Sequence, residues 1–154
     1  MPQNLSNMAP DFSLPDQSGK PITLSTFRGH PVILFFYPKA FTTGCTAEVC
    51  SFRDGYGALT AAGVTVLGIS PDPPNTLKNF AEQNRLPFPL LSDTDGRVRA
   101  AYGVSHTLGL FPQRKSFVID PSGRIVHTFN SQFRPTSHIA KALDAIKRLP
   151  HPKT

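Results

Sequence analysis

The chain has 154 residues, of which 39% are hydrophobic and 17% charged, the range of one soluble globular domain that folds without disulfide staples. Its net charge of +6 raises the question of nucleic-acid binding, but the Lys and Arg residues are scattered without a stripe of interleaved aromatic residues, so we expect a solvated basic surface and no nucleic-acid partner. Residues 1–20 lack the features of a secretory signal and no apolar run approaches the roughly 20 residues of a membrane span, so we expect a cytoplasmic protein without membrane contact.

Two short extended segments come first. Residues 11–14 and 21–24 flank Gln17-Ser18-Gly19-Lys20, the pattern of a small β-hairpin. Residues 31–37 then form a continuous apolar run, which is typical of a strand buried on both faces. We expect this run to be a central strand of the sheet.

From Cys45 the apolar spacing becomes that of an α-helix. The residues that share its inward face are Cys45, Val49, Phe52, Tyr56 and Leu59. A second buried strand follows over 64–69, then a proline-rich loop and a helix from about 76 to 84. Strand, helix, strand and helix in this order predict a parallel βαβ core.

The second half completes the fold. After residues 87–92 we expect a short helix over 96–102, then two strands, 116–119 and 124–129, that flank a type I turn at Asp120-Pro121-Ser122-Gly123. A final helix is expected from about 136 to 149. The order predicts an α/β, thioredoxin-like fold, with a central mixed sheet flanked by helices and an N-terminal β-hairpin extension. We expect residues 1–154 to form this single domain.

Cys45 and Cys50 are the only two cysteines. Cys45 follows Thr42, Thr43 and Gly44 at a predicted helix start, where unpaired N–H groups favour the thiolate, which is the nucleophilic form of a cysteine. In a reducing compartment a close pair of cysteines is typically catalytic or metal-binding rather than structural.

Spacing alone leaves several uses open for the pair. Cys50 is equally compatible with a small buried hydrophobic residue. A zinc site needs four ligands, but the chain has no second cysteine pair and its five histidines are far apart, so we expect no metal. A thioredoxin-type motif has two residues between its cysteines, whereas this pair has four.

The helix geometry also constrains a bond between the two cysteines. In one regular helix their Cα atoms would lie roughly 8 to 9 Å apart on different faces. A disulfide needs a Cα separation below about 7 Å. Any bond between Cys45 and Cys50 therefore requires the first turns of the helix to unwind.

The segment from Phe36 to Asp54 carries Pro38, Thr42 and Cys45 in the order Pro-x-x-x-Thr-x-x-Cys. This pattern resembles the peroxiredoxin active-site motif, and a cysteine five residues later resembles the bacterioferritin comigratory protein or PrxQ branch. The similarity extends from Ala9-Pro10-Asp11-Phe12 to the stretch that begins at Arg114. One difference is Thr43, where the branch often has proline, and this leaves loop rigidity and substrate preference open.

The resemblance implies roles for individual residues. Cys45 would be the peroxidatic and Cys50 the resolving cysteine, with Thr42 and Pro38 as motif partners and Arg114 as the active-site arginine. The implied activity is reduction of hydrogen peroxide and organic hydroperoxides through a Cys45 sulfenic acid and a Cys45–Cys50 disulfide, which thioredoxin or a similar dithiol recycles. The implied protein is a monomer without metal or organic cofactor.

Other interpretations stay beside this one. Considered alone, Arg114 would be a surface residue, Thr42 a helix-start residue and Pro38 the end of a strand. Three phenylalanines are compatible with the core or with a peroxide pocket: Phe35, Phe36 and Phe41. A different class of function, a non-enzymatic thiol-disulfide sensor or relay protein, would use the same two cysteines.

Overall fold

The computed structural model describes residues 8–36, 50, 52–104, 106–107, 111–112 and 115–130. The predicted final helix over 136–149 lies outside them. So do residues 37–49, the first of which is the last residue of the predicted central strand.

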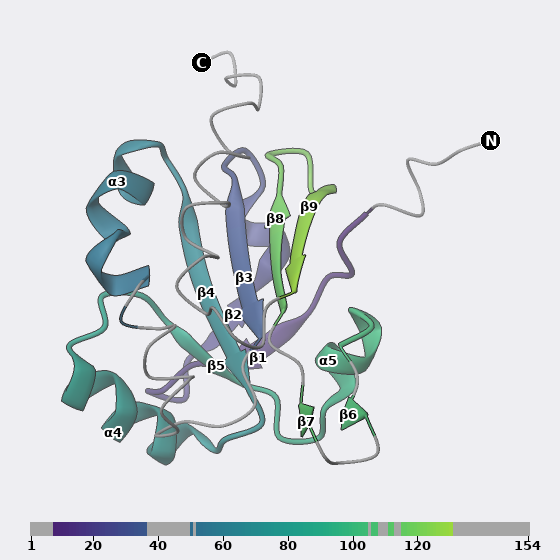
Figure 1. Ribbon diagram of the computed structural model, residues 1–154. Coiled ribbons are helices and arrows are strands. Elements are labelled where there is room, and N and C mark those ends of the chain that lie inside the picture. Colours follow the sequence, from purple (N-terminus) through teal and green to yellow (C-terminus); the bar gives the residue numbers. More distant parts are fainter. Residues whose placement is uncertain are drawn as a thin grey trace.

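A mixed sheet of five strands forms the centre of the fold (Figure 1). Its strands, in spatial order, are β5 (Leu90–Ser92), β4 (Thr65–Ser70), β3 (Val32–Phe36), β8 (Lys115–Ile119) and β9 (Ile125–Asn130). The pairs β3–β4 and β4–β5 are parallel, whereas β3–β8 and β8–β9 are antiparallel. The predicted central strand and the thioredoxin-like order of elements are therefore confirmed.

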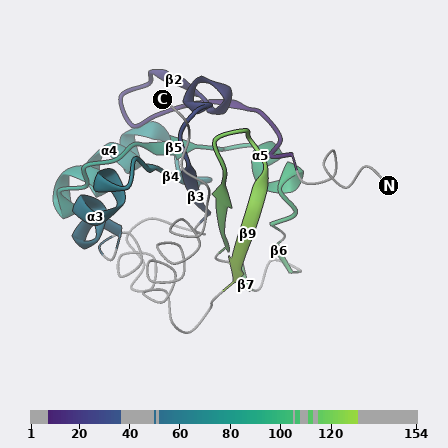
Figure 2. The ribbon, with the colours of Figure 1, turned by 90° about the horizontal axis from the view of Figure 1, so that it is seen from above.

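Helices cover the sheet from two sides. α3 (Tyr56–Ala61) and α4 (Pro74–Asn84) lie together on one side, and α5 (Arg97–Ala101) lies on the other (Figure 2). Cys50 and residues 52–54 are helical, and Gly55 separates this turn from α3. α4 begins two residues earlier than predicted, since Pro74 suits the first turn of a helix, where its missing N–H is not needed.

The side chains of β3 point alternately to the two faces of the sheet, and each face packs in a separate hydrophobic core. All five residues of the strand are buried. Ile33 and Phe35 belong to a cluster with residues of α3 and α4, whereas Leu34 and Phe36 belong to a second cluster with residues of α5 and the N-terminal segment. A strand with both faces covered reads as the continuous apolar run seen in the sequence.

Both predicted hairpins are present. β1 (Ser13–Pro15) pairs with β2 (Pro21–Thr23), and the Asp16 carboxylate accepts hydrogen bonds from two backbone N–H groups of the connecting turn. A 3-10 helix, η1 (Leu24–Phe27), follows β2. Between β8 and β9, Asp120 plays the same part as Asp16, and Gly123 has the positive φ of 96° that favours glycine. A short pair, β6 (His106–Thr107) and β7 (Phe111–Pro112), was not predicted.

The end of α4 is fixed by an unusual backbone conformation. Arg85 follows the helix with φ 52° and ψ 51°, the left-handed region that costs a non-glycine residue about 1 kcal/mol. The N–H groups of Arg85 and Leu86 donate to the carbonyls of Glu82 and Ala81, the pattern of a Schellman cap. The cap ends α4 directly after Asn84, its last residue.

Gly68 of β4 lies against the ring of Phe35. A Cβ at this position would lie 2.6 Å from Cζ of Phe35 and 2.9 Å from Cδ2 of Leu90. Gly68→Ala is therefore expected to lower the free energy of unfolding by about 1 to 3 kcal/mol, because the packed sheet must shift to admit a methyl group. Urea unfolding of the variant measures this loss.

Gly57→Ala is the matched control for Gly68→Ala. Gly57 lies in α3, and a Cβ there would meet nothing within 4 Å. Alanine at such a position should leave stability unchanged or raise it by about 0.5 to 1 kcal/mol. Equal unfolding midpoints for the two variants would show that the contact between β3 and β4 is looser than described.

Candidate active site

Four of the five predicted site residues lie outside the described part of the chain: Pro38, Thr42, Cys45 and Arg114. The structure does describe the two strand ends next to them in sequence. Phe36, the last residue of β3, pairs with Lys115, the first residue of β8. The segments that carry the predicted residues therefore continue from two strand ends that lie side by side. The roles of the four residues stay predictions.

Phe35 and Phe36 are core residues. Both rings are 0% exposed, which decides between the two interpretations that the sequence left open for them. Phe36 packs beside Tyr102 and Phe117, and Phe35 stacks on Phe52 with 4.6 Å between ring centroids. Phe41, the third phenylalanine of this group, lies outside the described residues.

Cys50, the fifth predicted residue, is a free thiol in the helical turn before α3. Its side chain is half-buried and packs against the cluster that contains Phe52 and Phe80. The thiol donates a hydrogen bond to Oδ1 of Asn84, with Sγ and Oδ1 3.5 Å apart. Cys50 therefore faces α4 in the reduced protein.

Arg53, which lies one helical turn after Cys50, also links this segment to α4. Its Nη1 donates to the backbone carbonyl of Asn84 at 2.8 Å, and its Nε donates to Asp54 at 3.0 Å. The hydrogen bond to Asp54, and then the negative charge that Cys50 carries when ionised, raise the pKa of Arg53. The guanidinium is thus a permanent cation beside the thiol.

Aromatic packing holds this turn against the sheet. Phe52 is fully buried and stacks almost parallel on Phe35, at an interplanar angle of 14°. Phe88 meets Phe35 edge-on with 5.7 Å between ring centroids, and its ring centroid lies 5.9 Å from that of Tyr56. The helical turn with Cys50 is therefore attached to β3, the strand that leads to the predicted peroxidatic loop.

A cleft of about 560 Å³ lies beside the residues that follow β4 and β5, at the edge of the sheet where β3 also ends. Its lining includes Pro71, Thr94 and Arg99. Burial lowers the pKa of Arg99, and the charges of Asp93 and Asp72 oppose this shift. In open α/β sheets ligands bind outside the carboxyl ends of the strands, so a ligand here would lie close to a buried cation.

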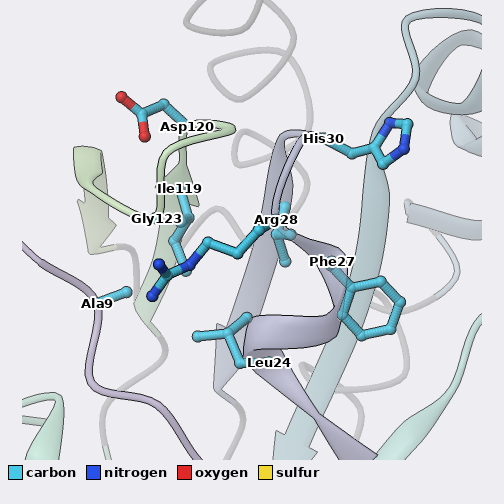
Figure 3. Close-up of a pocket in the computed structure, with 9 residues that line it drawn as sticks. Ala9, Leu24, Phe27, Arg28, His30, Ile119, Asp120 and Gly123 are labelled. Atoms are coloured by element: carbon cyan, nitrogen blue, oxygen red, sulfur yellow. The ribbon is translucent and has the colours of Figure 1, made fainter.

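A second pocket lies at the opposite end of the sheet (Figure 3). Arg28 lies across it, with its Nε 2.7 Å from the point that a Cβ at Gly123 would occupy. Its volume of about 10 Å³ corresponds to about one water molecule. The pocket is too small for an organic hydroperoxide, and it lies beside the start of β3 rather than its end.

Within the described ranges, no group of three or more His, Cys, Asp and Glu side chains is arranged to hold a metal ion. The helices in the same part of the chain are all too short or too polar to cross a membrane.

Comparison with known proteins gives concordant results. The model of the AhpC/TSA family matches residues 5–128. The chain is 44% identical to chloroplastic peroxiredoxin Q of Triticum aestivum over 144 residues, which are 93% of this chain and 66% of that protein. The crystal structure of peroxidoxin BcpB from Mycobacterium tuberculosis is 41% identical, with a TM-score of 0.87, and the match covers 94% of this chain and 96% of that one. The bacterioferritin comigratory protein of Xanthomonas campestris is 30% identical, with a TM-score of 0.81 over 88% of this chain and 90% of that one.

The chain therefore belongs to the AhpC/TSA family. Within this family its relatives are peroxiredoxin Q and bacterioferritin comigratory proteins, which confirms the branch that the cysteine spacing resembles. The chain spans about two thirds of the length of the Triticum relative.

Sequence reasoning missed Asn84 as a neighbour of Cys50, and it missed the hydrogen bond from Arg53 to the backbone carbonyl of Asn84. Asn84 is 34 residues from Cys50, and the inward residues of its helix gave no hint of a contact at the last position. The one available signal was Arg53 in the turn after Cys50, but its partner is a backbone carbonyl, which no side-chain pattern reveals.

Proposed function

We propose that this protein is a thiol-dependent peroxidase that reduces hydrogen peroxide and organic hydroperoxides, with Cys45 as the peroxidatic and Cys50 as the resolving cysteine. The observation that carries the proposal is a free, half-buried Cys50 in a helical turn, five residues after Cys45 in a chain of the AhpC/TSA family. The alkyl peroxide reduction described for the Xanthomonas campestris relative supports the substrate class.

The first step is attack of the Cys45 thiolate on one peroxide oxygen. The O–O bond breaks, the leaving oxygen takes up a proton to give water or an alcohol, and Cys45 becomes a sulfenic acid. Negative charge grows on the leaving oxygen, and a cationic Arg114 and the Thr42 hydroxyl are suited to stabilise it. Pro38 completes the motif. A thiolate is required because the thiol is a poor nucleophile.

The second step joins the two cysteines. Cys50 attacks the sulfenic sulfur, an S–S bond forms, and the sulfenic oxygen leaves as water. An external dithiol, which we propose to be thioredoxin, reduces the disulfide by thiol–disulfide exchange and supplies two electrons. No metal or organic cofactor enters this scheme. The monomeric state stays an expectation from the resemblance to the branch, and the cytoplasmic location stays a prediction from the sequence.

A coupled assay with thioredoxin, thioredoxin reductase and NADPH tests the proposal on the intact protein. Peroxide should cause continuous NADPH oxidation over many turnovers. The alternative, a non-enzymatic sensor or relay, would consume about one equivalent of peroxide slowly and then stop. Such a single turnover, if it persists with another dithiol reductant in excess, would contradict peroxidase function.

A further inference from the structure

The contacts of Cys50 take no part in the chemistry proposed above, yet they decide where its sulfur lies. The thiol donates to Oδ1 of Asn84, and Nδ2 of the same amide donates to the carbonyl of Phe80 at 3.0 Å. The second bond fixes the orientation of the amide, because only its nitrogen can donate to a carbonyl. Oδ1 is therefore left facing the thiol.

Asn84 is well placed to act as an anchor. It ends α4, whose Leu77 and Phe80 are fully buried, and the left-handed Arg85 closes the helix directly after it. Its backbone carbonyl also accepts the hydrogen bond from Arg53. Both the side chain and the main chain of one residue thus hold the helical turn of Cys50.

We propose that Asn84 is a positioning residue for the resolving step: it holds Cys50 in the helical conformation, and its release sets how often Cys50 turns towards Cys45. The inference rests on the proposed function, because it assigns Cys50 the resolving role. The contacts of Asn84 with Cys50 and Arg53 exist only while the turn is helical and the Cys50 sulfur faces α4. A disulfide requires the turn to unwind. These contacts therefore stabilise the helical, closed conformation of the turn relative to the unwound, open one.

The net strength of the hydrogen bond between Cys50 and Asn84 determines how much it slows the resolving step. A single uncharged hydrogen bond has a small net value, so loss of the Asn84 side chain should raise the population of the open turn about three-fold. Resolution would become faster by the same factor. A Cys45 sulfenic acid that Cys50 has not yet attacked can take an oxygen from a second peroxide molecule and become a sulfinic acid, with release of water or an alcohol. The hold on Cys50 therefore makes Cys45 more prone to overoxidation.

The test uses Cys45→Ser, in which Cys50 is the only cysteine and reports opening of the turn without any peroxide. We expect iodoacetamide to alkylate Cys50 about three times faster in Cys45→Ser with Asn84→Ala than in Cys45→Ser alone. Gln83→Ala, an exposed neighbour on the same helix, is the control and should leave the rate unchanged. Asn84→Asp keeps an acceptor oxygen and should not exceed the parental rate.

A general loss of stability would give a different result. Opening confined to one turn exposes little surface, so the faster alkylation should hardly depend on low urea concentrations, whereas alkylation through global unfolding rises steeply with urea. A rate in Asn84→Ala equal to the parental rate, an equally fast Asn84→Asp, or a steep urea dependence would each overturn the proposal.

Asn84→Ala in the chain that retains Cys45 tests whether the contact between Asn84 and Cys50 affects the resolving step. Asn84→Ala should give about a third of the parental sulfinic acid at a given peroxide concentration, as measured by mass spectrometry. An undiminished sulfinic fraction would overturn the proposed effect on resolution. Failure of the peroxidase proposal would appear separately, as absence of turnover in the parental protein, while the alkylation result would still report on the turn of Cys50.

Discussion

Cys45→Ser should remove peroxide turnover, lowering the steady-state rate by at least about a thousand-fold. A serine hydroxyl is not ionised at neutral pH, and the only other cysteine, Cys50, is held against α4 rather than at the end of β3. The measurement is peroxide consumption with a dithiol reductant in excess. Turnover that survives this substitution would exclude Cys45 as the peroxidatic residue.

The fold of this variant can be checked independently. The core cluster that contains Phe52, and against which Cys50 packs, includes residues of β3, α3 and α4, so the urea unfolding transition reports whether the described core is intact. A midpoint close to that of the unmodified chain shows that lost turnover reflects lost chemistry.

Cys50→Ser should separate the two steps of the reaction. We expect one equivalent of peroxide to be reduced at the normal rate. Thioredoxin-dependent cycling should then fall by at least about a hundred-fold, because the chain has no second thiol to displace the sulfenic oxygen. The serine hydroxyl can still donate to Asn84, so stability should change by less than about 1 kcal/mol. Stopped-flow peroxide consumption and the NADPH-coupled assay measure the two phases.

Two results would contradict this assignment of Cys50. Undiminished cycling in Cys50→Ser would mean that the external dithiol reduces the sulfenic acid directly. Loss of the first equivalent as well would mean that Cys50 is needed for attack on peroxide. The sulfenic acid of the variant should also accumulate and overoxidise, which mass spectrometry detects.

Local patterns in the sequence were sufficient to predict most of the described fold. The run at β3 is apolar at every position because both faces are covered, and Leu77, Phe80 and Ala81 recur on one side of α4 because only that side is buried. The turn at Asp120 has a side chain that replaces backbone partners. Each of these signals lies within a few residues of the element it defines.

Contacts between distant segments were beyond such reasoning. The approach of Gly68 to Phe35 depends on the register of two strands, and the contact of Cys50 with Asn84 depends on how two helices pack side by side. The prediction that Cys50 lies on a different face from Cys45 considers one isolated helix, which cannot show that Cys50 is half-buried and contacts α4. The motif residues Pro38, Thr42, Cys45 and Arg114 rest on resemblance to the family, since they lie outside the described residues.

The most direct test is mass spectrometry of the peroxide-treated protein without reduction. We predict a single chain in which the peptides containing Cys45 and Cys50 are joined by one intramolecular disulfide, and in which this bond disappears after incubation with reduced thioredoxin. Chains crosslinked to one another, or a Cys50 that stays a free thiol while Cys45 is oxidised, would contradict the proposed intramolecular disulfide.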